Sequence, residues 1–345
     1  QRQMCIRDSP ETDPNYFDQS GRKMNRAVPD HAEWNEGYDP GNPPSMWGAR
    51  WRADPNDEES HLEHAYYDSD IRDRDELKYN TENRHFDEQL PKVRKLYKSL
   101  IAAPHLADQA LGVMIALLDQ AYMRPGRKQH EKQSGSIGLV TLKKKNVTLK
   151  GNTATFTYTG KKGVEQTQTV TLDPTMMEIM TKLHKAPRKR VGDYFFSVPV
   201  KSGRDRVVFR EIGYNRLRRV LGTLGVTAKQ FRTYHGTEIF SKTFQRLLKR
   251  VKGRITGEVL DEVTHKSALA VAKALGHYVG KGKEQKLHVQ TALSSYIDPT
   301  VVRTLYLNAL TPDVEKAFKL QGRMEFQGLP ISIENRKGSV RKWYD

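Results

Sequence analysis

The chain has 345 residues, of which 37% are hydrophobic and 29% are charged, so it is long enough for two modest cores and a tail. It has neither an apolar run near the length of a membrane span nor a signal-peptide pattern, so the sequence predicts a soluble intracellular protein. The single cysteine, Cys5, excludes an intrachain disulfide, and no Cys/His spacing fits a structural zinc site.

The net charge of +17 is unevenly distributed. Residues 1–90 hold 11 basic and 21 acidic residues, whereas residues 91–345 hold 47 basic and 20 acidic ones. A long basic body is typical of a protein that binds a polyanion, and nucleic acid is the commonest such partner. The same charge also fits a solvated surface that only aids solubility.

The N-terminal quarter has little regular pattern. Residues 1–45 are polar and rich in Pro, Gly, Asp and Asn, so we expect them to be disordered. Residues 46–85 scatter aromatic residues among acids, which indicates a small β-rich unit. Helical spacing begins near Phe86, and a second apolar helix face continues to the segment around Arg124, where Pro125 ends the helix.

The hydrophobic period then changes from helical to two. Four Thr- and Val-rich segments, separated by glycine-containing turns, predict a small antiparallel meander: 138–142, 146–149, 153–159 and 165–172. Helices are expected again at 174–185, 207–222, 237–251, 259–276 and 299–309. The predicted fold class is α+β: a mainly α-helical domain with an inserted small antiparallel β-sheet, preceded by a small, β-rich N-terminal region.

The stretch SSYIDPTVV places Tyr296 beside a predicted helix start. A tyrosine with its ordinary pKa near 10 is a poor nucleophile at neutral pH. In a basic protein its natural target is a phosphodiester, whose transition state gathers negative charge while the leaving oxygen needs a proton. Such chemistry requires fixed cationic groups around one phosphate, and arginine suits this role because it stays charged and grips two oxygens.

Four further residues are placed to supply these groups. Arg124 ends an apolar helix, Lys161 lies at the tip of the turn TYTGKKG, Arg232 lies in KQFRTYHGT just before a predicted helix, and His277 ends the helix KSALAVAKALGH. Each also fits an ordinary structural role: a helix-dipole partner, a solvated turn lysine, a surface salt bridge and a helix C-cap. Tyr296 alone also fits a packed aromatic residue.

The order Arg–Lys–Arg–His–Tyr resembles that of the type IB DNA topoisomerases, especially their compact poxvirus-like and bacterial branch. The resemblance runs from about Phe86 to Leu310. LLDQAYMRPG is similar to the family's helix that ends at its first active-site arginine, and SIGLVTLKKKNV to its strand pair. TYTGKKG resembles its Phe-x-Gly-Lys turn, and KQFRTYHGT its Lys-Asp-x-Arg-Thr-Trp/Tyr motif. LGH and SSYIDP match the segments that carry the family's histidine and tyrosine.

The resemblance implies an isomerase that relaxes supercoiled double-stranded DNA. Tyr296 would attack a backbone phosphate, form a 3′-phosphotyrosyl link and free a 5′-hydroxyl strand. Arg124, Arg232 and His277 would contact the non-bridging oxygens, and Lys161 would act as general acid. The reaction would need no ATP, metal or small-molecule cofactor, and the protein would act as a monomer without a membrane partner.

The resemblance also implies a domain organisation. Residues 46–85 would be a degenerate, acidic form of the N-terminal DNA clamp, residues 86–310 the catalytic domain, and residues 311–345 a basic tail. One departure from the family is the stretch of 18 residues between His277 and Tyr296, where compact members have about ten. We expect a longer, lysine-rich loop there.

Two rival functions stay open. A tyrosine recombinase shares the helical domain and the phosphotyrosine chemistry, but it typically has His-x-x-Arg, and here Lys229 stands three residues before Arg232. A non-catalytic basic DNA-binding protein would use the cationic residues only to touch phosphate. Tyr278 and Tyr306 compete with Tyr296 for the nucleophile role, although the pattern around Tyr306 predicts packing.

Overall fold

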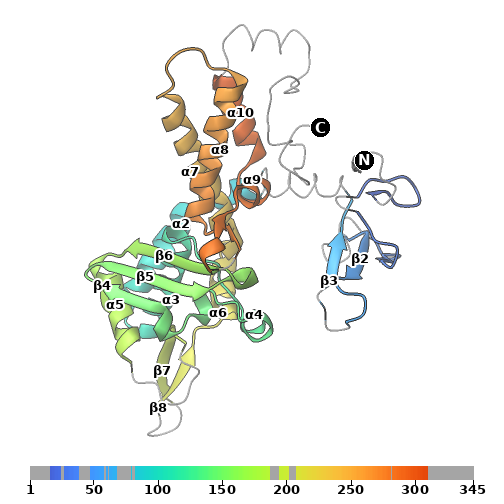
Figure 1. Ribbon diagram of the computed structural model, residues 1–345. Coiled ribbons are helices and arrows are strands. Elements are labelled where there is room, and N and C mark those ends of the chain that lie inside the picture. The colour runs from blue at the N-terminus through green and yellow to red at the C-terminus, as the bar shows by residue number, and fades with distance from the viewer. Residues whose placement is uncertain are drawn as a thin grey trace. The chain divides into compact units, whose positions relative to one another are not determined.

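The computed structural model describes residues 16–24, 27–38, 47–57, 60, 62–67, 79, 82–186, 194–201, 207–280 and 282–309, and the basic tail predicted at 311–345 lies outside them. The chain divides into two compact units, residues 1–82 and 83–345. Figure 1 shows the elements of both units, coloured from blue at the N-terminus to red toward the C-terminus.

The N-terminal unit contains a three-stranded antiparallel sheet in the order β1 (Glu33–Trp34), β2 (Ala49–Arg52) and β3 (Leu62–Ala65). Its small core consists of Met24, Val28, Ala49, Trp51, Ala65 and Tyr67. The expected β-rich character is confirmed. The prediction that residues 1–45 lack structure is wrong for Met24, Val28 and β1, because single apolar residues from separate segments build this core and leave no local pattern.

The first half of the larger unit packs helices around α3 (Leu106–Gln120). This helix is buried on almost every face, and α2 (Arg84–Ile101) lies against it and buries Phe86, Leu90, Val93 and Tyr97. Apolar residues at this spacing give α2 one buried stripe. α5 (Pro174–Lys185) and α6 (Tyr214–Gly222) contact α3 as well.

The inserted sheet has the order β4 (Val147–Lys150), β5 (Thr153–Thr159) and β6 (Glu165–Thr171), all antiparallel. Alternation in β5 turns Ala154, Phe156 and Tyr158 into the core and leaves the threonines outside. Figure 1 shows this sheet in green beside α3 and α5. A separate hairpin consists of β7 (Ser197–Lys201) and β8 (Val207–Glu211), and α4 (Lys128–Ser134) precedes the sheet.

The second half is a helical bundle of α7 (Ala228–Leu248), α8 (Gly257–Ala274), α9 (Val289–Tyr296) and α10 (Pro299–Ala309), drawn in yellow to red in Figure 1. It has a core of its own, which includes Phe240, Phe244 and Tyr306. The first turns of α7 pack into the other core through Ala228 and Phe231. α7 therefore joins the two cores, and the candidate site lies along it.

Three sequence-based element predictions are wrong. Residues 138–142 form no strand but a 3-10 turn at Leu139–Thr141, where consecutive side chains are all buried instead of alternating. The predicted helix 207–222 is instead strand β8 followed by α6. The backbone N–H and C=O groups of β8 find their hydrogen-bond partners in the antiparallel strand β7. The helix predicted to start at 237 begins at Ala228, since Thr227 and Gln230 form a capping box there.

The α+β class is confirmed: the described part of the larger unit is mainly helical and carries the inserted three-stranded antiparallel sheet and two short hairpins, and a small sheet lies in the N-terminal unit. Across the described residues, no helix is both long and apolar enough to cross a lipid bilayer.

Candidate active site

Tyr296, Arg232, His277 and Arg124 converge from four separate segments. The guanidinium carbon of Arg232 lies 5.1 Å from the centroid of the Tyr296 ring. The rings of His277 and Tyr296 are 4.6 Å apart at 37°. The charges of Arg232 and Arg124 both act on the phenol. The structure thus brings together four of the five predicted site residues.

Arg232 is held rigidly inside α7, and only 3% of the residue is exposed. Its Nη2 donates to the carbonyl of Leu275 at 2.8 Å, and its Nη1 donates to the carbonyl of Tyr122. Tyr122 has a φ of +54°, a left-handed conformation that is uncommon for a bulky residue. This turn, directly after α3, aims the Tyr122 carbonyl at Arg232 and leads the chain on to Arg124.

The two arginines make the site strongly electropositive. Burial, followed by the charge of Arg124, lowers the pKa of Arg232 to about 10, so Arg232 remains protonated at neutral pH. Within the described part of the chain, neither Arg124 nor Arg232 has a carboxylate partner. Two like charges without a counter-ion are costly in a buried position, and a bound anion would offset that cost.

The phenol of Tyr296 responds to the same charges. Burial alone would raise its pKa, but the charges of Arg232 and Arg124 lower it to about 8. An ordinary tyrosine ionises near pH 10. At neutral pH a much larger fraction of Tyr296 is therefore ionised to the phenolate, the nucleophilic form, than of a solvated tyrosine.

His277 is neutral in this environment. Burial, and then the charges of Arg232, Arg124 and His288, lower the pKa of its imidazole to about 2. Nη2 of Arg232 lies 3.1 Å from its Nε2, and a guanidinium only donates, so Nε2 accepts and the ring proton sits on Nδ1. Nδ1 is buried and has no hydrogen-bond partner among the described residues.

Lys161 is the predicted residue that the structure does not bring to the others. It begins the 3-10 turn Lys161–Gly163 between β5 and β6, and its side chain is exposed. The adjoining strands do reach the site, because Gln166 of β6 donates to the carbonyl of Gly276 at 3.1 Å. The amine of Lys161 is therefore attached to a hairpin that contacts the site, while it makes no hydrogen bond or ion pair to any described residue.

The stretch between His277 and Tyr296 was expected to be a longer loop, and this expectation is wrong. It forms a short hairpin of β9 (Tyr278–Val279) and β10 (Lys286–Leu287), followed by α9. The amide of His288 donates to the carbonyl of His277 at 2.8 Å, and the His288 ring caps α9. Tyr296 is consequently the last residue of a helix that is tied to His277 at its start. His277 lies beyond the end of α8 and does not belong to its last turn.

Sequence reasoning missed several residues that build the site. Gly236 and Thr237 follow Arg232 on α7 and contact the backbone around Tyr296. Asp119 and His235 form a buried bond of 2.7 Å between α3 and α7. The one signal that pointed to them is their position within the quoted motifs, since Asp119 lies in LLDQAYMRPG and the other three lie in KQFRTYHGT.

The competing tyrosines lie elsewhere. Tyr306 is 1% exposed, and its hydroxyl lies 2.6 Å from that of Thr264, so the predicted packing role is confirmed. Tyr278 lies half-buried in β9. Among the contacts of the described residues, none joins Tyr278 to Arg124 or Arg232.

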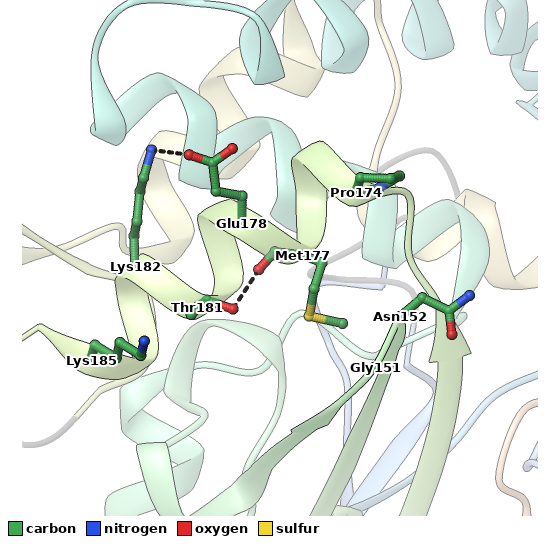
Figure 2. A pocket seen from close by; sticks show the side chains of 8 residues that line it. All are labelled: Gly151, Asn152, Pro174, Met177, Glu178, Thr181, Lys182 and Lys185. Atoms are coloured by element: carbon green, nitrogen blue, oxygen red, sulfur yellow. Dashed lines mark hydrogen bonds and ion pairs between the residues drawn. The ribbon is translucent and has the colours of Figure 1, made fainter.

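A hollow of about 570 Å³ lies between α5 and the β4–β5 turn, well outside this group of residues (Figure 2). Its lining consists of Gly151, Asn152, Pro174, Met177, Glu178, Thr181, Lys182 and Lys185. In Figure 2 the amine of Lys182 points back to Glu178 of the same helix, with which it forms an ion pair of 2.6 Å. None of the five predicted site residues lines it.

Comparison with known proteins gives a consistent set of matches. Residues 68–298 match the family described as eukaryotic DNA topoisomerase I, catalytic core. The chain is 24% identical over 204 residues to DNA topoisomerase 1 of Schizosaccharomyces pombe, covering 58% of this chain and 23% of the yeast protein. It is 26% identical over 201 residues to DNA topoisomerase 1 of Candidozyma auris, covering 58% and 25%.

The chain thus spans about a quarter of the length of these relatives. The assignment to the compact poxvirus-like and bacterial branch stays a prediction, because these matches do not bear on it. The family match covers well over half of the chain and includes Arg124, Lys161, Arg232, His277 and Tyr296. The chain therefore belongs to the family of the eukaryotic DNA topoisomerase I catalytic core.

Proposed function

We propose that this protein is a type IB DNA topoisomerase, which relaxes supercoiled duplex DNA through transient cleavage of one strand. The observation that carries the proposal is the phenol of Tyr296 lying against two arginines that have no carboxylate partner in the described residues, with its pKa lowered to about 8. A phosphodiester supplies the anion that such a site favours, and the activated phenol supplies the nucleophile.

In the proposed cleavage step, the Tyr296 phenol loses its proton to solvent and its oxygen bonds to phosphorus. The bond between phosphorus and the 5′-oxygen breaks, and the electron pair goes to that oxygen, which takes up a proton. Arg124 and Arg232 would hold the non-bridging oxygens and stabilise the extra negative charge of the transition state. His277, which is neutral, would add one N–H donor.

Lys161 would donate the proton to the 5′-oxygen. It lies on an exposed turn whose strands contact the site through Gln166. A lysine on such an exposed turn would meet DNA from the solvent side, and bound duplex would complete the site. Religation is the reverse reaction, and because the phosphotyrosyl bond keeps the energy of the broken bond, it would need no ATP, metal ion or cofactor.

The partner would be double-stranded DNA inside the cell, bound by a single copy of the chain. The 47 basic residues against 20 acidic ones after residue 90 support this partner. Residues 46–85 would serve as a reduced clamp, residues 86–310 as the catalytic part, and residues 311–345 as a basic tail.

The test is plasmid relaxation with excess chelator and without ATP. The parent protein should relax the plasmid, and Tyr296→Phe should abolish both relaxation and the covalent adduct while DNA binding is retained. Tyr278→Phe, which removes the hydroxyl of the neighbouring tyrosine, is the matched control and should relax DNA at the parent rate. Peptide mapping of the trapped adduct should identify Tyr296.

An adduct on another tyrosine would overturn the assignment of the nucleophile. Strand exchange between two specific sites, with no relaxation of a plasmid that lacks them, would indicate that the protein is a recombinase and not a topoisomerase. Binding without any nicking by the parent would leave a DNA-binding protein only.

A further inference from the structure

A single buried carboxylate joins α2, α3 and α7. Asp119 of α3 is 4% exposed. One of its oxygens lies 2.7 Å from Nε2 of His235 on α7, and the other accepts from Nε of Arg94 on α2 at 2.9 Å. The hydroxyl of Tyr97, also on α2, donates to it at 3.3 Å. All four groups are thus satisfied at one point.

This cluster lies beside the two arginines, and neither Asp119 nor His235 touches the phenol in the described contacts. Asp119 lies five residues before Arg124, and His235 lies three residues after Arg232, about one helical turn along α7. The bond between Asp119 and His235 therefore sets how the end of α3 meets α7, and with it the separation of the two arginines.

A second contact path runs through Tyr122. The His235 ring lies 4.8 Å from the Tyr122 ring, and the carbonyl of Tyr122 accepts the hydrogen bond from Nη1 of Arg232. The left-handed φ of Tyr122 means that its backbone is held by its surroundings and not by local preference. His235 thus supports the residue that connects Arg232 to the chain segment of Arg124.

A merely stabilising role explains this arrangement poorly. A buried carboxylate with charged partners adds little over well-packed apolar side chains of the same volume, although breaking it is costly. The hydrogen bonds of Asp119 instead restrict geometry: because each has a preferred distance and angle, together they define one register between the helices, where apolar contacts permit several. The energetic cost of burying Asp119 makes sense where precise placement matters.

We propose that Asp119 and His235 are positioning residues, which hold α3 and α7 in the register that directs Arg124 and Arg232 onto one phosphate. The proposal rests on the proposed function and deepens it. It assigns to His235 an action through Nε2, while its Nδ1, which lies 3.2 Å from Glu238, is dispensable.

The chemistry of His235 allows a sharp pair of variants. In His235→Gln the side-chain amide can place its nitrogen near the position of Nε2 and still donate to Asp119. In His235→Asn the shorter amide reaches only the position of Nδ1, so the bond to Asp119 is lost. Asp119→Asn keeps the shape but turns an NH₂ group toward groups that are themselves donors. The matched control is Asp108→Asn, also on α3, whose ion pair with Arg216 at 2.7 Å lies about 16 Å along the helix from Asp119.

The experiment measures single-turnover cleavage at saturating DNA, together with DNA affinity and thermal unfolding. His235→Asn and Asp119→Asn should cleave at least about tenfold more slowly than the parent, since a misplacement of 1 Å costs on the order of 10²-fold. DNA affinity should change by less than about threefold, and His235→Gln and Asp108→Asn should stay within about threefold of the parent rate. Equal rates for His235→Gln and His235→Asn, or slow cleavage that merely follows lost thermal stability in all four variants, would overturn the proposal.

A second measurement does not depend on catalysis. Titration of ring-labelled tyrosines by NMR, with the Tyr296 signal assigned by its loss in Tyr296→Phe, should give a pKa of about 8 in the parent. The groups that face this phenol are Arg232, Arg124 and His277. His235→Asn and Asp119→Asn should move the pKa toward ~10 as the arginines shift away, whereas His235→Gln should not. A parent that never cleaves DNA would defeat the proposed function alone, and an unmoved phenol pKa in these variants would defeat the positioning role alone.

Discussion

Gly236 of α7 lies directly against the backbone of Tyr296, so that a Cβ at position 236 would come within 2.4 Å of the Tyr296 carbonyl oxygen. On the next residue, Oγ1 of Thr237 accepts a hydrogen bond of 3.0 Å from the amide of Asp298. The helix that carries Arg232 therefore also fixes the position of the backbone around Tyr296. A side chain at position 236 could not be accommodated by a change of rotamer, because the nearest atoms of residue 296 belong to the backbone.

Gly236→Ala should slow DNA cleavage by at least about tenfold without unfolding the protein. Alanine favours a helix by about 1 kcal/mol over glycine, so lost activity would reflect a displaced Tyr296 and not a weakened α7. Single-turnover cleavage and thermal unfolding check this expectation. Gly222→Ala is the matched control, since its Cβ would meet nothing within 4 Å at the end of α6. Parent-like cleavage by Gly236→Ala would show that the segment around residue 296 adjusts freely.

Arg124→Ala and Arg232→Ala should each reduce the cleavage rate by about 10²-fold or more, the scale expected for loss of an electrostatic stabiliser. DNA affinity should fall far less, because each variant removes only one of the 47 basic residues after residue 90. Arg246→Ala, on the exposed side of the same α7, is the control and should cleave DNA at the parent rate. Cleavage rates measured at saturating DNA separate the two effects, and relaxation at the parent rate by both variants would refute the assignment.

The pH dependence of cleavage at subsaturating DNA should follow the Tyr296 phenol of the free protein. The rate should rise about tenfold per pH unit below pH 8 and level off above it, because the pKa is lowered to about 8 and only the phenolate attacks. No further step should appear near pH 6.5, since the pKa of His277 is lowered to about 2 and its ring stays neutral. In Arg124→Ala the rise should move to higher pH, as one of the charges that lower the phenol pKa is gone. A profile that is flat from pH 6 to 9 would contradict this account.

Lys161→Ala should slow cleavage of ordinary DNA by about 10²-fold, the usual contribution of a positioned general acid. A substrate in which sulfur replaces the leaving 5′-oxygen needs no proton on departure, so on that substrate the variant should approach the parent rate. Lys162→Ala, one residue along the same turn, is the control and should behave as the parent on both substrates. An equal deficit of Lys161→Ala on both substrates would assign Lys161 to phosphate binding and not to proton transfer.

Local sequence patterns determined the elements that bury one face against a core. The stripe of Phe86, Leu90, Val93 and Tyr97 specified α2, and the alternation in TATFTYT specified β5, because each period puts its apolar side chains on one side whatever they pack against. Periodicity did not identify Arg124, Lys161, Arg232, His277 and Tyr296 as a site; the resemblance of their short contiguous motifs to those of the type IB topoisomerases did.

Only the tertiary structure decided how these groups meet. The 3-10 turn at Leu139–Thr141 is buried on successive residues and so shows no period to read. The bond between Asp119 and His235 joins positions 116 residues apart, and nothing local to either residue signals the other. The lowered pKa of Tyr296 likewise arises from charges contributed by distant segments, whereas Lys161 lies apart from them on an exposed turn. Interactions between neighbours in sequence can be read from spacing, whereas hydrogen bonds and electrostatic fields depend on distances in space, which exist only after the chain has folded.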